Sequence, residues 1–454
     1  MNRWVKTSLG AALLLLCAAA VLWVLNTQDE AAWVSAVTPA STMAASATPD
    51  ALTRGAYLAK AGNCAGCHTV RGGAPYAGGL RIATPFGPVY ASNLTPDMTT
   101  GIGRWSNADF WRALHNGRSK DGRLLYPAFP YTSYTQVPRE DADALLAFLK
   151  SQRPVVQANT PHAVRFPYNS QLALAVWRAL YFSPKTFQPD AKQGPDYNRG
   201  AYLVNGLGHC SACHSARNAM GASSGLHLAG GLIPVQNWYA PSLVSPLEAG
   251  IDKLGVADMV AVLKTGVSSR ASVLGPMAEV VLGSTQHLSE ADLNAMALYL
   301  KALGENQIQS QTPATATTDL KISVMGTTPT PQALSVPPAV AAYGAQLYEQ
   351  HCAQCHGVQG QGQRLGNLNA YPALAGNRAV LMPQTANLVQ IVLNGGYAPA
   401  TSGNPRPFGM PPFVMVLEDA DIAAVLTHVR RSWGNQAEVV SPLDVNRVRA
   451  NQVP

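Results

Sequence analysis

The chain has 454 residues, of which 47% are hydrophobic, and its formal net charge is +7 at pH 7. This length accommodates about three domains of ~150 residues, and the hydrophobic content is sufficient to bury a core in each. Six of the seven cysteines fall in three short motifs, which excludes a fold that is held together by a disulfide framework.

At the N-terminus, a short basic stretch precedes an apolar segment. Arg3 and Lys6 are followed by Ser8–Leu25, which would span about 27 Å as a helix and so reach across the hydrocarbon core of a bilayer. We favour a retained membrane anchor over a cleaved secretory signal for residues 1–30, because Asn26–Glu30 stand where a cleavage site would have small residues. Either interpretation exports the body of the chain, because the basic residues stay on the cytoplasmic side.

One five-residue motif, Cys-x-x-Cys-His, occurs three times, at residues 64–68, 210–214 and 352–356. This motif is the attachment site of a c-type haem, in which both thiols form thioether bonds with the porphyrin and the histidine binds the iron. A zinc site would need cysteine pairs that converge from one domain, whereas here each pair carries its own histidine. The sequence therefore predicts three covalently bound haem c groups.

Each motif supplies two thioether bonds and one iron ligand. The predicted thioether-forming cysteines are Cys64, Cys67, Cys210, Cys213, Cys352 and Cys355, and the predicted iron ligands are His68, His214 and His356. The propionates of three haems, about six carboxylates, would offset most of the formal charge of +7. The charge therefore gives no reason to expect a nucleic-acid partner.

Helical patterns recur around each motif and indicate an internal repeat. A helix with a Gly-Ala pair precedes each motif, and a helix with an acidic start ends each repeat. The pairs are Gly55-Ala56, Gly200-Ala201 and Gly344-Ala345, and the later helices begin near Asp141, Asp292 and Asp421. Three loops, Tyr90–Leu94, Tyr239–Leu243 and Tyr371–Leu374, are predicted to pack on the haems rather than to be ordinary turns. The layout resembles the small class I cytochrome c fold, repeated three times.

This resemblance implies an all-α architecture of three tandem class I cytochrome c domains behind an N-terminal anchor or signal helix. The predicted domains are residues 51–153, 191–304 and 339–436, separated by an interdomain segment, 154–190, and a linker, 305–338. The linker is rich in Thr, Pro, Ala and Gln, so we expect an extended connection and a mobile third domain. The last 18 residues contain no apolar run and are predicted to form a surface tail.

A methionine opposite the histidine is the expected second iron ligand, because a thioether there gives a closed, low-spin electron-transfer site. In the third domain, Met410 lies in a Met-Pro-x-Phe sequence ahead of the last helix. In the second domain, Met277 lies 63 residues after His214 in the sequence Gly-Pro-Met. The other methionines of these domains are interpreted as packing residues; they are Met259, Met296, Met382 and Met415.

The first domain departs from this pattern, because Phe129 occupies the position where a methionine would fit. Three alternatives stay open for its haem: Met98 binds the iron, the haem is five-coordinate, or another residue such as His115 serves. His115 is more simply interpreted as a surface or packing residue of a helix. Arg71 and Arg217 each follow a motif histidine by three residues, and they either pair with propionates or are ordinary surface arginines.

A family resemblance rests on five stretches, which are Ala77–Gly87, Tyr90–Asp97, Gly101–Ser106, Tyr126–Tyr131 and Arg199–His214. They are similar to the trihaem cytochrome c subunits of bacterial membrane-bound dehydrogenases, of the alcohol, aldehyde, gluconate and fructose dehydrogenase type. The resemblance implies a subunit without catalytic residues that accepts electrons from a catalytic subunit with flavin, pyrroloquinoline quinone or molybdenum. It further implies that the electrons pass to ubiquinone of the respiratory chain, at the periplasmic side of the bacterial cytoplasmic membrane.

Two competing functions belong to other classes. A haem peroxidase-like enzyme would use an open first haem, which the presence of Phe129 motivates. A non-haem redox or zinc protein would use the cysteines without covalent haem. The haem repeats occupy most of the chain and no convincing nucleotide-binding loop is present, so we assign substrate chemistry to a partner and electron transfer to this chain.

Overall fold

The computed structural model describes residues 3–27, 49–249, 251, 254–310, 336–366 and 368–451. The chain divides into two compact units. Unit 1 comprises Met1–Lys192, Tyr202–His209 and Asn218–Ala222, and unit 2 comprises Gln193–Ala201, Cys210–Arg217 and Ser223–Pro454. Most of the predicted linker, residues 311–335, lies outside the described residues.

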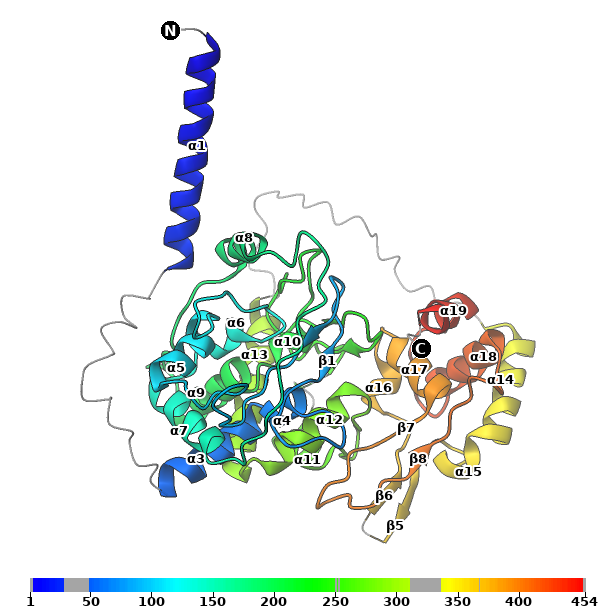
Figure 1. Cartoon of the computed structure of the whole chain (residues 1–454). Coiled ribbons are helices and arrows are strands. Elements are labelled where there is room, and N and C mark those ends of the chain that lie inside the picture. Colours follow the sequence, from blue (N-terminus) through cyan, green and yellow to red (C-terminus); the bar gives the residue numbers. More distant parts are fainter. Residues whose placement is uncertain are drawn as a thin grey trace. The chain divides into compact units, whose positions relative to one another are not determined.

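Unit 1 contains the first motif and is mainly helical (Figure 1). Its helices are α1 (Arg3–Asn26), α3 (Pro49–Ala61), α4 (Cys64–His68), α5 (Asn107–Asn116), α6 (Tyr131–Tyr134), α7 (Arg139–Lys150), α8 (Gln171–Tyr181) and a π-helical turn, η2 (Leu203–Leu207). Two short antiparallel strands, β1 (Arg81–Ile82) and β2 (Val89–Tyr90), pair after the motif. Helix α9 (Pro195–Tyr202) runs from unit 2 into unit 1.

Unit 2 contains the second and third motifs. Its remaining helices are α10 (Ser211–His214), α11 (Val256–Thr265), α12 (Pro276–Gly283), η3 (Thr285–His287), α13 (Glu290–Ser310), α14 (Pro338–His351), α15 (Ala353–His356), α16 (Arg378–Leu381), α17 (Ala386–Asn394), α18 (Asp419–Arg431) and α19 (Pro442–Ala450). Its antiparallel strand pairs are β3 (Gly231–Leu232) with β4 (Tyr239–Ala240), β5 (Gln363–Leu365) with β6 (Leu368–Tyr371), and β7 (Gly396–Tyr397) with β8 (Gly409–Met410). The described chain is thus helix-rich, with short strand pairs that the all-α prediction did not include.

The helix before each motif crosses the last helix of its repeat at a glycine. A Cβ atom on Gly55, Gly200 or Gly344 would overlap the carbonyl oxygen of Ala144, Ala295 or Ala424, respectively. Each of these alanines lies three residues after the aspartate near the start of its helix. The Gly-Ala pairs of the sequence therefore mark the points where two helix backbones come into direct contact, which a larger residue would prevent.

The predicted acidic helix starts bind the first helix of each repeat. Each aspartate is the third residue of α7, α13 or α18, where a carboxylate interacts favourably with the positive end of the helix dipole. Its side chain also accepts a hydrogen bond from the earlier helix: Arg54 Nε to Asp141 Oδ1 (2.7 Å), Arg199 Nε to Asp292 Oδ1 (2.8 Å) and Tyr343 Oη to Asp421 Oδ1 (2.8 Å). One acid thus stabilises both a helix terminus and a helix crossing.

The C-terminal residues form a packed helix, so the prediction of a surface tail was wrong. The Ser441 hydroxyl accepts a hydrogen bond from Asp444 N, and the Asp444 carboxylate accepts one from Ser441 N, which caps α19. Val445 is fully buried against the core that α17 and α18 provide. The prediction failed because a single buried valine with a capping pair is too short a pattern to give helical periodicity.

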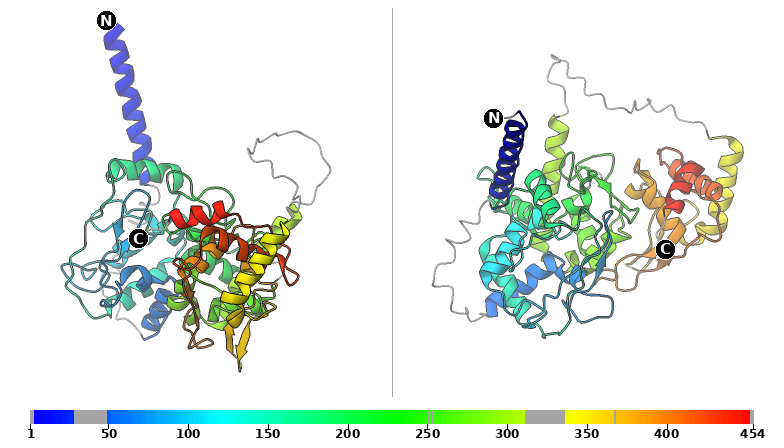
Figure 2. Two further views of the ribbon diagram at one scale, coloured as in Figure 1. Left: turned by 90° about the vertical axis from the view of Figure 1, so that its right-hand side faces the viewer. Right: turned by 45° about the horizontal axis from the view of Figure 1, so that its top comes forward.

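The C-terminal end of α1 contacts α8, as Figure 1 and Figure 2 both show. Asn26 Nδ2 donates to the Ala175 carbonyl at 3.0 Å, and Arg178 Nε donates to Asn26 Oδ1 at 2.9 Å. Helix α8 lies within the predicted interdomain segment, residues 154–190. Within the part of the chain that the structure describes, no helix combines the length and apolar character needed to cross a membrane.

We predict that Gly200→Ala destabilises unit 2, because the added Cβ would overlap the Ala295 carbonyl. Overpacking of this kind costs about 1–3 kcal/mol, and more where backbone must move. Urea unfolding followed by circular dichroism measures the change in the free energy of unfolding. Gly194→Ala is the matched control, because a Cβ there meets no atom within 4 Å. Equal effects of the two substitutions would contradict the close crossing.

Candidate haem-binding sites

Each motif histidine contacts a backbone carbonyl in the loop that the sequence predicts to pack on its haem. His68 Nδ1 lies 2.7 Å from the Ser92 oxygen, His214 Nδ1 lies 2.7 Å from the Pro241 oxygen, and His356 Nδ1 lies 2.9 Å from the Pro372 oxygen. A carbonyl can only accept, so Nδ1 carries the proton and donates it. The other nitrogen, Nε2, keeps its lone pair for a metal, which is the usual arrangement around a metal-bound histidine.

Burial lowers the pKa of all three histidines, whereas the carbonyl contact partly opposes this shift. The imidazoles are therefore neutral at pH 7, which is the form that binds iron. Burial also raises the pKa of the first cysteine in each motif, to about 12 for Cys64 and Cys210 and about 11 for Cys352.

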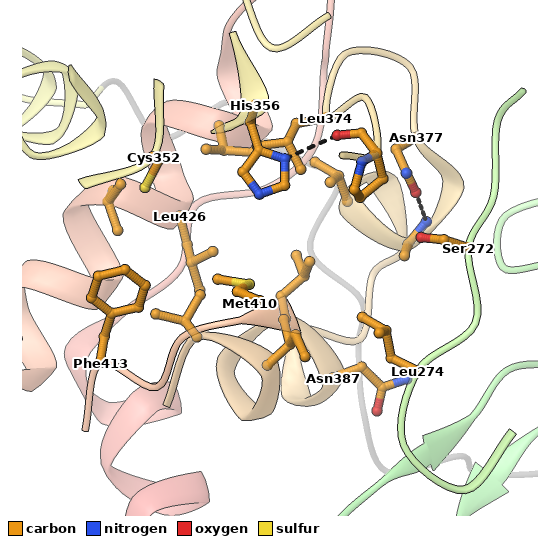
Figure 3. A pocket seen from close by; sticks show the side chains of 18 of the residues that line it. Ser272, Leu274, Cys352, His356, Leu374, Asn377, Asn387, Met410, Phe413 and Leu426 are labelled. Carbon is orange, nitrogen blue, oxygen red and sulfur yellow. Dashed lines mark hydrogen bonds between the residues drawn. The ribbon is translucent and has the colours of Figure 1, made fainter. Parts of the chain in front are cut away.

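The third motif opens into a pocket with mainly apolar walls. Cys352, His356 and Met410 all line it, together with Phe413 and Leu426. Figure 3 shows the His356 ring and the Met410 side chain on facing sides of this pocket. A cysteine, a neutral imidazole and a thioether around an apolar cavity fit a covalently attached haem with two axial ligands.

The other methionines of the third domain do not share this position. Met382 is buried, at 5% exposure, which agrees with its interpretation as a packing residue. Met415 is 92% exposed, so its interpretation as a core residue was wrong. Met415 lies in the turn between the Met410 loop and α18. The sequence of this turn is apolar, which suggested burial, but the turn lies on the surface.

In the second domain, Met277 is the second residue of α12 and is half-buried. The preceding Gly275 has φ +55°, and a Cβ there would lie 2.6 Å from the Trp238 ring. Met259 and Met296 are buried at 5% and 4% exposure, in agreement with their predicted packing role.

In the first domain, Met98 is 57% exposed, and the Phe129 ring contacts the rings of Tyr131 and Tyr134 in tilted and edge-on arrangements, at centroid distances of 6.5 and 5.4 Å. His115 is buried, at 3% exposure, and its Nδ1 lies 2.8 Å from the Thr135 oxygen. These surroundings fit the interpretation of His115 as a packing residue. Phe129, which stands in the sequence where a methionine was expected, belongs to an aromatic cluster with Tyr131 and Tyr134.

Tyr134 is a residue of the first site that the sequence analysis missed. Its hydroxyl donates to the Gly62 carbonyl at 3.1 Å, next to the motif. Burial raises the pKa of Tyr134 well above its usual value, and the nearby Cys64 and Cys67 contribute to the shift. The aromatic run Tyr126–Tyr134 was the available signal.

The two arginines that follow motif histidines differ in their surroundings. Arg71 is exposed, whereas Arg217 is half-buried and its Nη2 donates to the Ala212 carbonyl of α10 at 2.6 Å. Arg217 therefore holds the backbone of the second motif.

Comparison with known proteins identifies the family. The cytochrome c family model matches residues 52–153 and 341–433, which contain the first and third motifs. The chain is 37% identical to the cytochrome c subunit of alcohol dehydrogenase (quinone) from Gluconacetobacter polyoxogenes, over 90% of this chain and 86% of that protein. The chain belongs to the cytochrome c subunits of bacterial dehydrogenases.

Two further members of this family align over similar lengths. The gluconate 2-dehydrogenase cytochrome c subunit of Pantoea cypripedii is 39% identical over 89% of this chain and 90% of its own length. The fructose dehydrogenase cytochrome subunit of Gluconobacter japonicus is 34% identical over 92% of this chain and 86% of its own length. The protein is thus an electron-transfer subunit with covalently bound haem c rather than a catalytic subunit, and these relatives do not favour the peroxidase alternative.

We predict that Met410→Ala opens the sixth position of one haem, since Met410 faces His356 across the pocket. The ferric protein should gain one high-spin signal, and the ferrous protein should bind carbon monoxide at one haem. Electron paramagnetic resonance and carbon monoxide difference spectra measure both effects. Met415→Ala, on the exposed side of the same loop, is the control and should leave both spectra unchanged. An unchanged low-spin spectrum in Met410→Ala would rule out Met410 as the ligand.

Proposed function

We propose that this chain carries three haems and relays electrons from a separate catalytic dehydrogenase subunit to ubiquinone of the respiratory chain. The observation that supports it best is the threefold recurrence of one arrangement, a half-buried motif histidine whose Nδ1 is held by a carbonyl 16 to 27 residues further along the chain. A bound haem c supplies reversible one-electron chemistry, which suits electron transfer.

The proposed ligand sets differ among the three sites. His214 and Met277 hold the second iron, and His356 and Met410 hold the third. His68 would hold the first iron; Met98 is exposed, and Phe129, in the position expected for a methionine, packs against Tyr134. Because a thioether ligand raises the potential of a haem, the first haem is expected to differ from the other two in potential.

The proposed partner is a dehydrogenase subunit with flavin, pyrroloquinoline quinone or molybdenum. The relatives support it, because their names assign them to alcohol, gluconate and fructose dehydrogenases. The proposed location is the periplasmic side of the cytoplasmic membrane. The basic residues before the apolar segment Ser8–Leu25 support this location, with residues 1–30 as the anchor or signal.

We predict that intact-protein mass spectrometry of the exported chain finds three covalent haems. Replacement of both Cys210 and Cys213 by Ala should remove one of them, because no thioether bond can then form at the second motif. Replacement of Cys17, which lies outside the motifs, is the control and should leave the haem content unchanged. A mass with two haems in the native chain would overturn the count.

Isolation of the native complex tests the relay itself. We expect gentle solubilisation to yield this chain with a stoichiometric dehydrogenase subunit, whose substrate reduces the haems within the complex. Absorbance of the reduced haems, followed with and without added ubiquinone analogue, measures the transfer. Recovery of the chain alone, or haems that the substrate reduces but ubiquinone does not reoxidise, would contradict the proposal.

A further inference from the structure

The pocket of the third haem is lined by residues of two repeats. Most of its walls come from the third repeat, including His356 and Met410, but Trp238, Ser272 and Leu274 come from the second. Figure 3 shows Ser272 and Leu274 on a chain segment that passes along the side of the pocket, opposite Phe413. The lining residues from both repeats belong to the same compact unit, unit 2.

Hydrogen bonds hold the two repeats together at this wall. The Asn387 side chain of α17 pairs with the backbone of Tyr239, because its Nδ2 donates to the Tyr239 oxygen at 2.7 Å and its Oδ1 accepts from the Tyr239 nitrogen at 2.8 Å. The Arg378 guanidinium of α16 donates to the carbonyls of Pro246 and Glu248, each at 2.8 Å. These contacts are directional and use backbone groups, so they fix the position of β4, which directly follows Trp238.

The second repeat also restrains the wall from its own side. Gly275 leaves room for the Trp238 ring, since a Cβ at this position would lie 2.6 Å from it. Leu274, the residue before this glycine, packs against the hydrophobic core of the third repeat. Leu274 lies two residues before Pro276, where α12 begins. The loop that leads to Met277 therefore also provides an apolar side chain to the third site.

We propose that Trp238 and Leu274 are positioning residues of the third haem, which complete its pocket and keep water from it. The proposal deepens the relay function, because it rests on a haem bound at residues 352–356. Ferric haem carries one more positive charge than ferrous haem, so an environment without water favours the reduced form. Docking of the second repeat thus raises the reduction potential of the third haem.

The test is a redox titration of the full-length, haem-loaded chain followed by electron paramagnetic resonance. The signal that disappears in Met410→Ala identifies the third haem. We expect Trp238→Ala and Leu274→Ala each to shift its oxidised-to-reduced ratio toward the oxidised form by on the order of tenfold, about 59 mV for a one-electron couple. Asn387→Ala, which removes the paired contact with Tyr239, should shift the same haem in the same direction.

Leu282→Ala is the matched control, because Leu282 lies in the same repeat on α12 and is 47% exposed. It should leave the third potential unchanged, and all variants should leave the first potential and the haem content unchanged. If Trp238→Ala loses haem, Trp238→Phe keeps an aromatic ring in the wall and should give a smaller shift of the same sign. An unchanged third potential in Leu274→Ala and Trp238→Phe, both with full haem content, would overturn the proposal.

The titration needs no partner protein, so it separates this inference from the relay. A shifted third potential in a chain that no dehydrogenase reduces would leave the shared pocket intact and overturn the relay. A working relay with unshifted third potentials in the variants would leave the relay intact and overturn the shared pocket.

Discussion

The contact between a motif histidine and a downstream carbonyl is the constraint on which the rest of this structure depends. The Cys-x-x-Cys-His motif alone places an imidazole next to two thiols, but it leaves the ring free to rotate and to exchange tautomers. A carbonyl oxygen within 2.9 Å of Nδ1 ends both freedoms, since the ring must donate there. The loop that supplies the carbonyl must therefore return to the motif, and the short strand pairs before it direct that return.

The helix crossings impose a second constraint, which is repeated with the same residues. A glycine of the first helix lies directly against an alanine carbonyl of the last, and an aspartate three residues earlier binds the first helix from the other side. Close backbone packing and a charged hydrogen bond thus act at adjacent turns. Because this crossing forms beside the motif, it brings the termini of each repeat together around the site of haem attachment.

In unit 2, residues of two repeats line one pocket. The third repeat contains its own histidine, cysteines and methionine, yet one wall comes from Trp238 and Leu274 of its neighbour. Side chains of α16 and α17 hold this wall through the backbone carbonyls and the amide of the second repeat. The chemical identity of the site is local to one repeat, whereas its solvent exclusion depends on two.

The sequence by itself determined the chemistry and the repeat. Cys-x-x-Cys-His is a continuous pattern whose residues act together whatever the surroundings, and the Gly-Ala and Asp positions recur at matching places, so an internal repeat could be inferred. Met410 could also be proposed from the sequence, because its loop has the local pattern Met-Pro-x-Phe, and in the structure it lines the same pocket as His356. Tertiary structure alone decided the exposure of Met415 and Met98, the packing of α19, the role of Tyr134 and the wall from Trp238. Each of these depends on contacts between residues far apart in the chain, and no local pattern records which surface a side chain will meet once the helices have packed.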